Sequence, residues 1–548
     1  MKKGFTLIEL LAVIVILAIV ALITSPIIIG IMDDARKGAF TDSAYGIIKA
    51  GEIFFSTNIL NGTFKEVTFN YKDGVESPSI TGKKLDYKGE KPKSGSIIIN
   101  SEGQIALAIH DGTYCVNKKY KDIEVTISLT KLDECTIFYN DGTGAPIPEL
   151  ATGMIPVTYD ETNSRWIKAD IYEKWYDYNS QMWANAVTVT GTNRETYLNA
   201  KPGIEIPIAD INTMWVWIPR YKYAIPTGTG AREINIVFES KSTTKSTGNA
   251  DGTNYRTHPA FWWNNNSDDN RDGDEEISGF WVGKFETTTT LQSPTILPRK
   301  TPIEFTSLSG LYKASRKMEK KLANEKVYGW ETVASESQLN TNGSFNDDTN
   351  DIDIHMAKNS EWGAVAYLSR SKYGKNSEVY KNNNNATSDT TGCAGDYAND
   401  IAINRCEYSY NTVKGGYAST TGNIYGVYDM SGGTEEFVMG LYLPISGSIA
   451  DGSGFSANAS IDNLPASKYW DRYTTSDLIN TACNGKCYGH ALSETSGWYG
   501  ASSPAGSASY PWFTRGSDTE DNSGADIFTY SRDAGNSSYS FRVVLLKP

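Results

Sequence analysis

Histidine and positive charge are both scarce in this chain of 548 residues. Asp and Glu outnumber Lys and Arg by 64 to 51, which leaves a formal net charge of −13. Nucleic acid is therefore disfavoured as the main partner, because phosphate backbones require a positive footprint. The few histidines are scattered without the paired spacing of histidine metal sites: His110, His258, His355 and His490.

The chain also lacks the features of a cleavable secretory signal. Such a signal has an apolar core of roughly 7 to 15 residues followed by a small-residue cleavage site. Here the apolar run extends from Phe5 to Met32, and no Ala-x-Ala boundary follows it. About 20 apolar residues are enough to span a membrane. We therefore expect residues 5–32 to form the transmembrane part of an N-terminal helix.

Glu9 is the one charged residue in that run. A carboxylate in hydrocarbon costs about 2.5–3.5 kcal/mol, so it needs a partner. With Gly4 and Phe5, it resembles the N-terminus of type IV prepilins and type II secretion pseudopilins. The resemblance implies that residues 1–4 are a leader, which a prepilin peptidase removes before methylation of Phe5. It also implies that Glu9 pairs with the amine of a neighbouring subunit, whereas a plain anchor would leave this acid unexplained.

Helical spacing continues beyond the membrane segment. Apolar residues recur with that spacing from Phe40 to Phe54, until Asn61-Gly62 interrupts the pattern. One long helix before an antiparallel sheet is the plan of a pilin head, which would cover residues 33–142. The sheet is predicted from alternating apolar residues in four segments: 65–71, 95–100, 104–109 and 124–127.

The pattern of residues 143–204 predicts a linker and a small β module. This module is either a separate domain or the first strands of the C-terminal region. From 205 to 548 the chain is mostly short apolar stretches in Gly-, Asn- and Ser-rich loops. The clearest strands are 214–221 and 279–286. The best helix is 361–369, with Asn359 or Ser360 as its N-cap.

The stretch Gly422–Phe437, GNIYGVYDMSGGTEEF, is similar to the signature of the formylglycine-generating-enzyme (sulfatase-modifying factor) superfamily. As in that family, a helix precedes this stretch, here the one around Trp362. Two further elements come after it, Arg515-Gly516 and Ser540-Phe541-Arg542. The resemblance implies a C-type-lectin-like fold for residues 205–548. The expected class is thus α+β, a pilin-like helix and sheet followed by a loop-rich lectin-like domain. The departures from the signature are Gly433, Glu435, Phe437 and Ser540.

Catalysis is not expected. The resemblance implies that oxidising members hold copper with a cysteine pair in the C-terminal core, but no cysteine follows Cys487. Iron-dependent members use a histidine site, and the histidines of this chain lack its spacing. Without either ligand set, no cofactor is required.

Six cysteines occur, and an exported chain can oxidise them. Neighbours in sequence predict three short-range disulfides, of which Cys115 with Cys135 is favoured, although six cysteines allow 15 connectivities. Zinc is the alternative for the segment 483–490, whose cysteines and histidine lack a fourth ligand. The remaining candidates are Cys393, Cys406, Cys483 and Cys487.

Residues 268–274 are a calcium candidate. Oxygen donors alternate there as in EF-hand-like loops, with Gly273 where the loop turns sharply. The bidentate Glu of such loops is missing, since Gly279 occupies its place, and a solvated acidic turn is the alternative. The candidate ligands are Asp268, Asn270, Asp272 and Asp274.

The stretch 512–539 has the Tyr, Ser, Asn and Gly of adaptable binding loops. Solvated surface loops are the alternative. The same fold also resembles the variable proteins of diversity-generating retroelements, which vary ligand residues in this region. The ligand-binding candidates are Trp512, Arg515, Asp518, Asp521, Tyr530, Arg532, Asn536 and Tyr539.

These patterns together predict a surface protein held in the cytoplasmic membrane by one span and then built into an extracellular fibre. So large a head suits a minor or tip subunit of a type IV pilus or pseudopilus, with adhesion as its task. The expected partners are prepilin peptidase, other pilin subunits, the cytoplasmic membrane and an extracellular protein or glycan. The alternative is a structural pseudopilin of a secretion or competence apparatus.

Overall fold

The computed structural model describes residues 7–59, 64–130, 132, 135–263, 275–319, 352–382, 390–394, 407–442, 452–455, 464–474, 488–500, 509–516 and 526–547. The chain divides into two compact units, Met1–Tyr139 and Asn140–Pro548. The division falls close to residue 143, where the sequence predicts that a linker begins. We call the two parts unit 1 and unit 2 and describe each by itself.

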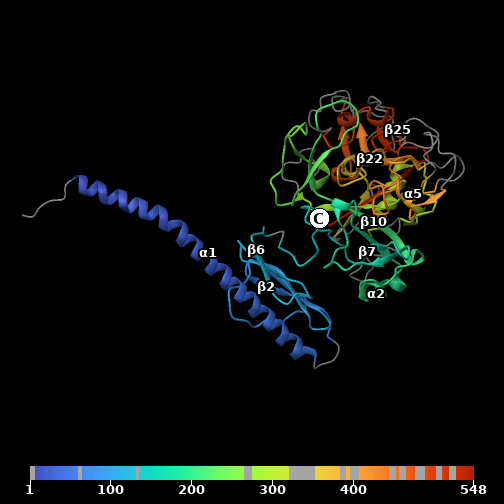
Figure 1. The fold of residues 1–548 in the computed structure, drawn as a ribbon. Helices are drawn as coiled ribbons and strands as arrows, with labels where there is room; N and C mark the ends of the chain where they lie inside the picture. Colours follow the sequence, from blue (N-terminus) through green and yellow to red (C-terminus); the bar gives the residue numbers. More distant parts are fainter. Residues whose placement is uncertain are drawn as a thin grey trace, which may run out of the picture. The chain divides into compact units, whose positions relative to one another are not determined.

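Unit 1 consists of one long helix, α1 (Leu7–Ile59), and a six-stranded antiparallel sheet. The strand order is β2-β1-β3-β4-β5-β6. In Figure 1 the second half of α1 lies along this sheet, and the first half extends beyond it. The strands are β1 (Val67–Lys72), β2 (Val75–Pro78), β3 (Ser94–Ile99), β4 (Ile105–His110), β5 (Cys115–Lys118) and β6 (Thr126–Ser128).

Four of these strands fall where alternation predicts them, while β2 and β5 were missed. For β2 a signal exists, because Asp73-Gly74 closes a two-residue hairpin with Lys72 paired to Val75. Both turn residues have positive φ, 51° and 78°. Asp-Gly is a preferred dipeptide for such a turn.

The outer half of α1 is amphipathic and packs on the sheet. Phe40, Ala44, Ile47 and Phe54 are buried, as their spacing predicts, in one cluster with sheet residues such as Leu107. Gly51 allows a close approach, since a Cβ there would lie 2.9 Å from Cδ1 of Ile105. Burial of this stripe therefore attaches the head to the helix.

Within the described residues, no helix combines the length and the apolarity that a membrane crossing requires. The membrane span expected over residues 5–32 therefore stays a prediction.

Unit 2 is built on two larger sheets, whose strands β7 and β10 in one and β22 and β25 in the other are labelled in Figure 1. One is a seven-stranded antiparallel sheet of order β19-β27-β16-β10-β9-β7-β8. Its strands are β7 (Ile155–Asp160), β8 (Arg165–Lys168), β9 (Asn185–Val189), β10 (Ile211–Pro219), β16 (Gly279–Gly283), β19 (Asp353–Met356) and β27 (Val543–Leu546).

The second sheet has the order β23-β22-β24-β25, and β26 pairs with β22 in parallel. Its strands are β22 (Glu436–Tyr442), β23 (Asp471–Tyr473), β24 (Trp512–Arg515), β25 (Tyr530–Asp533) and β26 (Ser540–Phe541). Three further sheets of unit 2 combine β11 (Tyr221–Ala224) with β12 (Asn235–Phe238) and β13 (Arg256–Thr257), β14 (Trp262–Trp263) with β15 (Glu275–Glu276), and β20 (Cys393–Ala394) with β21 (Tyr408–Ser409).

A hairpin, four α-helices and short 3₁₀ helices such as η3 (Pro259–Phe261) complete the described part of unit 2. Helix α4 begins two residues earlier than the predicted 361–369, with Lys358 at the N-cap position instead of Asn359 or Ser360. The backbone N–H of Lys358 donates to the Glu361 carboxylate at 2.8 Å. The elements are α2 (Gly191–Asn199), β17 (Thr288–Thr290), β18 (Ser293–Thr295), α3 (Leu308–Lys317), α4 (Asn359–Ser369) and α5 (Val413–Gly416).

Strands β7 to β9 decide how residues 143–204 relate to the rest. β9 pairs with β10, and Val187 lies opposite Met214. Strands on both sides of residue 204 thus share one sheet. Residues 143–204 provide the first strands of unit 2, which is one of the two interpretations that the sequence left open.

A buried lysine connects this sheet to the stretch Gly422–Phe437, which we call the signature segment. Lys284 is completely buried, and its Nζ donates to Asn185 Oδ1 at 2.8 Å, Ile424 O at 2.6 Å and Gly426 O at 3.0 Å. Burial lowers the pKa of Lys284 well below its usual range. The three acceptors match the three N–H donors of an ammonium group, so they oppose that effect.

We expect Lys284→Met to destabilise unit 2 by about 2–5 kcal/mol, because three buried acceptors would lose their donor. All 13 tryptophans lie in unit 2, so urea unfolding followed by tryptophan fluorescence reports this unit alone. Lys300→Met, at an exposed position, is the control and should change little. Equal midpoints for the two variants would show that the Lys284 network is not needed for stability.

Candidate functional site

The N-terminal motif reaches the structure only in part. Gly4 and Phe5 lie outside the described residues. Glu9 lies in α1, which begins at Leu7. Its side chain is also outside the description, so its pairing with a neighbouring amine stays a prediction.

The first half of α1 presents an uncovered apolar surface. The large apolar side chains that the structure describes between Leu7 and Met32 are exposed, by 47 % at Val13 to 85 % at Leu7. Water around so many aliphatic groups is unfavourable, and contiguous apolar surface of this kind indicates a lipid or protein interface. This half of the helix therefore has the surface of a lipid or protein interface.

Charged groups mark the point where the apolar half of α1 ends. The Tyr114 hydroxyl donates to Asp33, and Lys37 Nζ lies 3.3 Å from the same carboxylate. Both interactions lower the pKa of Asp33. One turn on, Arg36 Nε contacts Asp111 at 2.8 Å. These pairs join the helix to the loop between β4 and β5.

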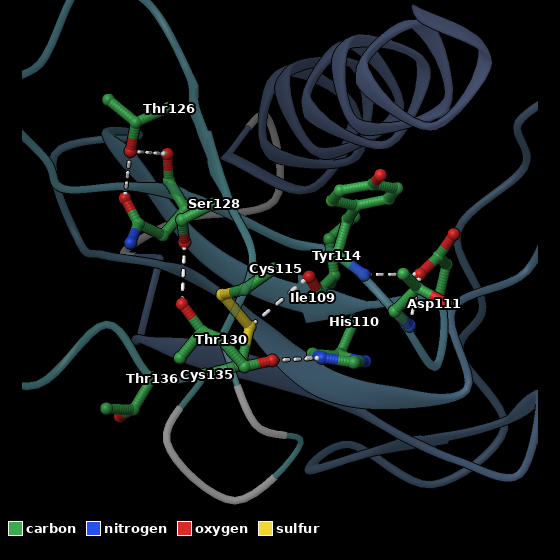
Figure 2. The surroundings of a disulfide bond; sticks show 12 residues. Ile109, His110, Asp111, Tyr114, Cys115, Thr126, Ser128, Thr130, Cys135 and Thr136 are labelled. Atoms are coloured by element: carbon green, nitrogen blue, oxygen red, sulfur yellow. Dashed lines mark hydrogen bonds between the residues drawn. A yellow bond between two sulfur atoms is a disulfide. The ribbon is translucent and has the colours of Figure 1, made fainter. Parts of the chain in front are cut away.

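The disulfide of unit 1 lies beside this loop. Cys115, in β5, is bonded to Cys135, the pairing favoured from sequence. Figure 2 shows the bridge next to Ile109, whose carbonyl oxygen lies 3.3 Å from Cys135 Sγ. Cys393 is also in a disulfide. Cys406, Cys483 and Cys487 lie outside the described residues.

His110 helps to hold the returning chain. Gly112 donates its backbone N–H to Nδ1 of His110 at 2.8 Å, so the ring proton is on Nε2. Nε2 lies 2.7 Å from the Thr130 carbonyl oxygen, as Figure 2 shows. The segment after β6 is thus fastened to β4 by a hydrogen bond and to β5 by the disulfide.

Three of the ligand-binding candidates are core residues. Trp512, Arg515 and Tyr530 are buried in the sheet formed by β24 and β25. They cannot form an exposed binding surface, because neighbouring elements cover them. Arg532 and Tyr539 are partly exposed and Asn536 is exposed, whereas Asp518 and Asp521 lie outside the described residues.

Arg515 has a structural role. Its guanidinium donates to Asn359 Oδ1 at 2.8 Å, His490 O at 2.6 Å and Ala491 O at 3.0 Å. Burial lowers the pKa of Arg515 to about 10. The group therefore connects β24 with α4 and with the segment 488–500. All three of these hydrogen bonds are made inside the protein.

The signature segment meets the chain end in the core. Arg542 donates to Glu436 Oε1 at 2.6 Å and to Tyr428 O at 2.9 Å. Asp429, with φ of 62°, accepts from Asn382 Nδ2 at 2.6 Å and from Gly392 N at 2.8 Å. Burial raises the pKa of Asp429 despite these donors. These acids are paired in the interior.

A buried charge cluster joins β19 to α4. His355 Nδ1 lies 2.7 Å from Asp353 and its Nε2 lies 3.1 Å from Glu361. Burial acts to lower the pKa of His355, but the two carboxylates outweigh it and raise the pKa. Arg316 contacts Asp353 at 3.2 Å. This histidine serves as an ion-pair partner in the interior.

Within the described ranges, no group of three or more His, Cys, Asp or Glu side chains could hold a metal ion. The calcium candidates Asp268, Asn270, Asp272 and Asp274 lie outside those ranges, as do the cysteines of the zinc alternative. The remaining member of that alternative, His490, contacts the Tyr473 hydroxyl through Nδ1.

Asp526 is a buried acid that the sequence did not single out. It is 1 % exposed, and its Oδ1 accepts from Phe528 N at 2.8 Å. Its Oδ2 has no hydrogen-bond partner among the described residues. Burial raises the pKa of Asp526 to about 8. No local pattern reveals such a position, because its desolvation is produced by distant segments.

One family comparison bears on the N-terminus. Residues 1–25 match the family described as the prokaryotic N-terminal methylation motif. Among curated proteins, none matches the chain. The chain therefore has a prepilin-type N-terminus, which implies processing by a prepilin peptidase and assembly with other pilin subunits. The similarity of residues 205–548 to the formylglycine-generating-enzyme superfamily stays a prediction.

The pKa of Asp526 predicts a specific pH dependence. Its folded pKa of about 8 exceeds the unfolded value of about 3.9, so the folded state binds the extra proton between these values. The stability contributed by the neutral acid is thus lost as pH rises from about 4 to about 8. In Asp526→Asn, unit 2 should lose this dependence.

The measurement is the urea midpoint of tryptophan fluorescence between pH 4.5 and pH 8. The control is Asp251→Asn, at an exposed position, which should keep the slope of the unsubstituted chain. Parallel curves for all three proteins would contradict the assigned protonation of Asp526.

Proposed function

We propose that this chain is a prepilin-like subunit of a type IV pilus or pseudopilus and that unit 2 is its non-catalytic, ligand-binding domain. The observation that carries the fibre part is the methylation motif at residues 1–25 together with the exposed apolar half of α1. Both are explained if that half is covered by lipid before assembly and by other helices afterwards.

In this proposal a prepilin peptidase cuts between Gly4 and Phe5, and the amino group of Phe5 is methylated. The segment 5–32 holds the protein in the cytoplasmic membrane and later enters the fibre core. Glu9 pairs with the amine of an adjacent subunit, which offsets the cost of its desolvation. The head remains outside the apolar core and is displayed on a fibre or the cell surface.

The size of unit 2 supports a minor or tip position. It spans Asn140–Pro548, and packing so large a unit on every subunit of a helical fibre would be sterically demanding. A display role also agrees with a sequence in which no cysteine follows Cys487, where oxidising relatives of the resembled superfamily carry a copper-binding pair. Adhesion or capture of an extracellular protein or glycan is the task we assign.

Burial of Trp512, Arg515 and Tyr530 favours a second candidate. A C-terminal region whose aromatic and basic residues are core would suit a structural pseudopilin, in which unit 2 only adjusts assembly. The two functions differ in whether unit 2 has a ligand.

Glu9→Val in the native host tests the fibre part. We expect the variant to be cleaved and membrane-bound but depleted at least tenfold from purified fibres, because the charge pair that positions the subunit is lost. Immunoblots of fibre and membrane fractions give the measurement.

Leu10→Val is the matched control, since it changes the neighbouring apolar residue without removing a charge. Its incorporation should equal that of the unsubstituted chain. Normal incorporation of Glu9→Val would refute the assembly role.

A further inference from the structure

Unit 2 has a groove that is lined by none of the ligand-binding candidates in the stretch 512–539. Its volume is about 480 Å³ and it is open to solvent, and strand β17 with the turn residue Leu291 and the segment 301–305 form its walls. Six of its lining side chains could contact a ligand: Thr289, Thr290, Leu291, Thr301, Glu304 and Phe305.

Phe305 provides an exposed and fixed aromatic ring. It is 39 % exposed, and its backbone N–H donates to Tyr539 O at 3.3 Å. On its other side the ring lies against α3 at Gly310, where a Cβ would fall 2.6 Å from Phe305 Cε1. Glycine at this position therefore lets the ring rest on the helix backbone while part of it faces solvent.

Thr289, in the strand that neighbours the segment 301–305, has a strained backbone. Its φ is 84°, a left-handed conformation that is a genuine outlier for a β-branched residue. Such strain, about 1–3 kcal/mol, often occurs at binding sites. Thr289 Oγ1 also lies 2.5 Å from Thr295 Oγ1 in β18. The strained residue thus places a positioned hydroxyl group at the groove.

The lining combines two kinds of chemistry. Phe305 and Leu291 offer apolar contact, and an aromatic face favours the weakly positive edge of C–H groups. The threonine hydroxyls donate and accept hydrogen bonds, and the Glu304 carboxylate accepts strong ones from hydroxyl groups. No lysine or arginine is among the described lining residues, so an anionic ligand would meet no compensating charge.

We propose that this groove binds a neutral saccharide. A pyranose ring has an apolar C–H face for Phe305 and hydroxyl groups at its edge for Glu304 and the threonines. The inference rests on the display function proposed above, and it names the ligand class. It also moves the ligand site away from the buried residues Trp512 and Arg515 to a surface beside Tyr539, the candidate whose backbone bonds Phe305.

The test uses the full chain purified in detergent and the disaccharides lactose, cellobiose and mannobiose coupled to a biosensor, with sialyllactose as an anionic comparison. We expect at least one neutral disaccharide to bind. Phe305→Ala should weaken this binding about tenfold through loss of the aromatic contact. Phe305→Trp should keep it, and Glu304→Gln should weaken it several-fold.

Tyr417→Ala is the matched control, because Tyr417 is 38 % exposed and does not line the groove. It should bind as the unsubstituted chain does. Urea unfolding followed by tryptophan fluorescence shows whether each variant is folded, and equal midpoints are expected.

Each of the following results would overturn the inference: no binding of any neutral disaccharide, binding of sialyllactose alone, or equal loss in Phe305→Ala and Tyr417→Ala. Saccharide binding that Phe305→Ala leaves unchanged would also remove the groove as the site while keeping adhesion. Failure of the fibre proposal is seen separately, in the incorporation of Glu9→Val.

Discussion

Unit 2 depends on one buried cation. The ammonium group of Lys284 can leave water only if acceptors surround it, because an unpaired charge in the interior is very costly. Its three acceptors come from Asn185 and the segment 424–426, which are far apart in sequence. Trp166 and Tyr428 place their rings 5.3 and 5.4 Å from Nζ. The hydrogen bonds of this one ammonium group thus hold together β9, the end of β16 and the signature segment.

The same constraint recurs around other buried charges. Arg515 joins β24 to α4, Arg542 joins the last strand to Glu436, and His355 is held between two carboxylates. In each case a polar group is paired inside the protein, so it cannot serve an external ligand. The proposed binding chemistry must therefore come from residues on the outside, such as the exposed ring of Phe305 and the hydroxyl groups of hairpin β17–β18.

The two units divide the proposed function between them. The exposed apolar half of α1 is an unfavourable surface in water, and it becomes favourable only against lipid or other helices. The buried stripe from Phe40 to Phe54 keeps the head on that helix. Unit 2 carries no comparable run of apolar residues.

Local patterns were enough to determine α1, four of the strands in unit 1, the prepilin-type N-terminus and the favoured disulfide between Cys115 and Cys135, because periodicity, motif spacing and short loops act over neighbouring residues. The Asp73-Gly74 turn could also have been used. Only the tertiary structure decided that Trp512, Arg515 and Tyr530 are core, that Asp526 is desolvated, and that Phe305 is an exposed ring against Gly310. Burial is a property of contacts between distant segments, so the side chain's own identity does not reveal it.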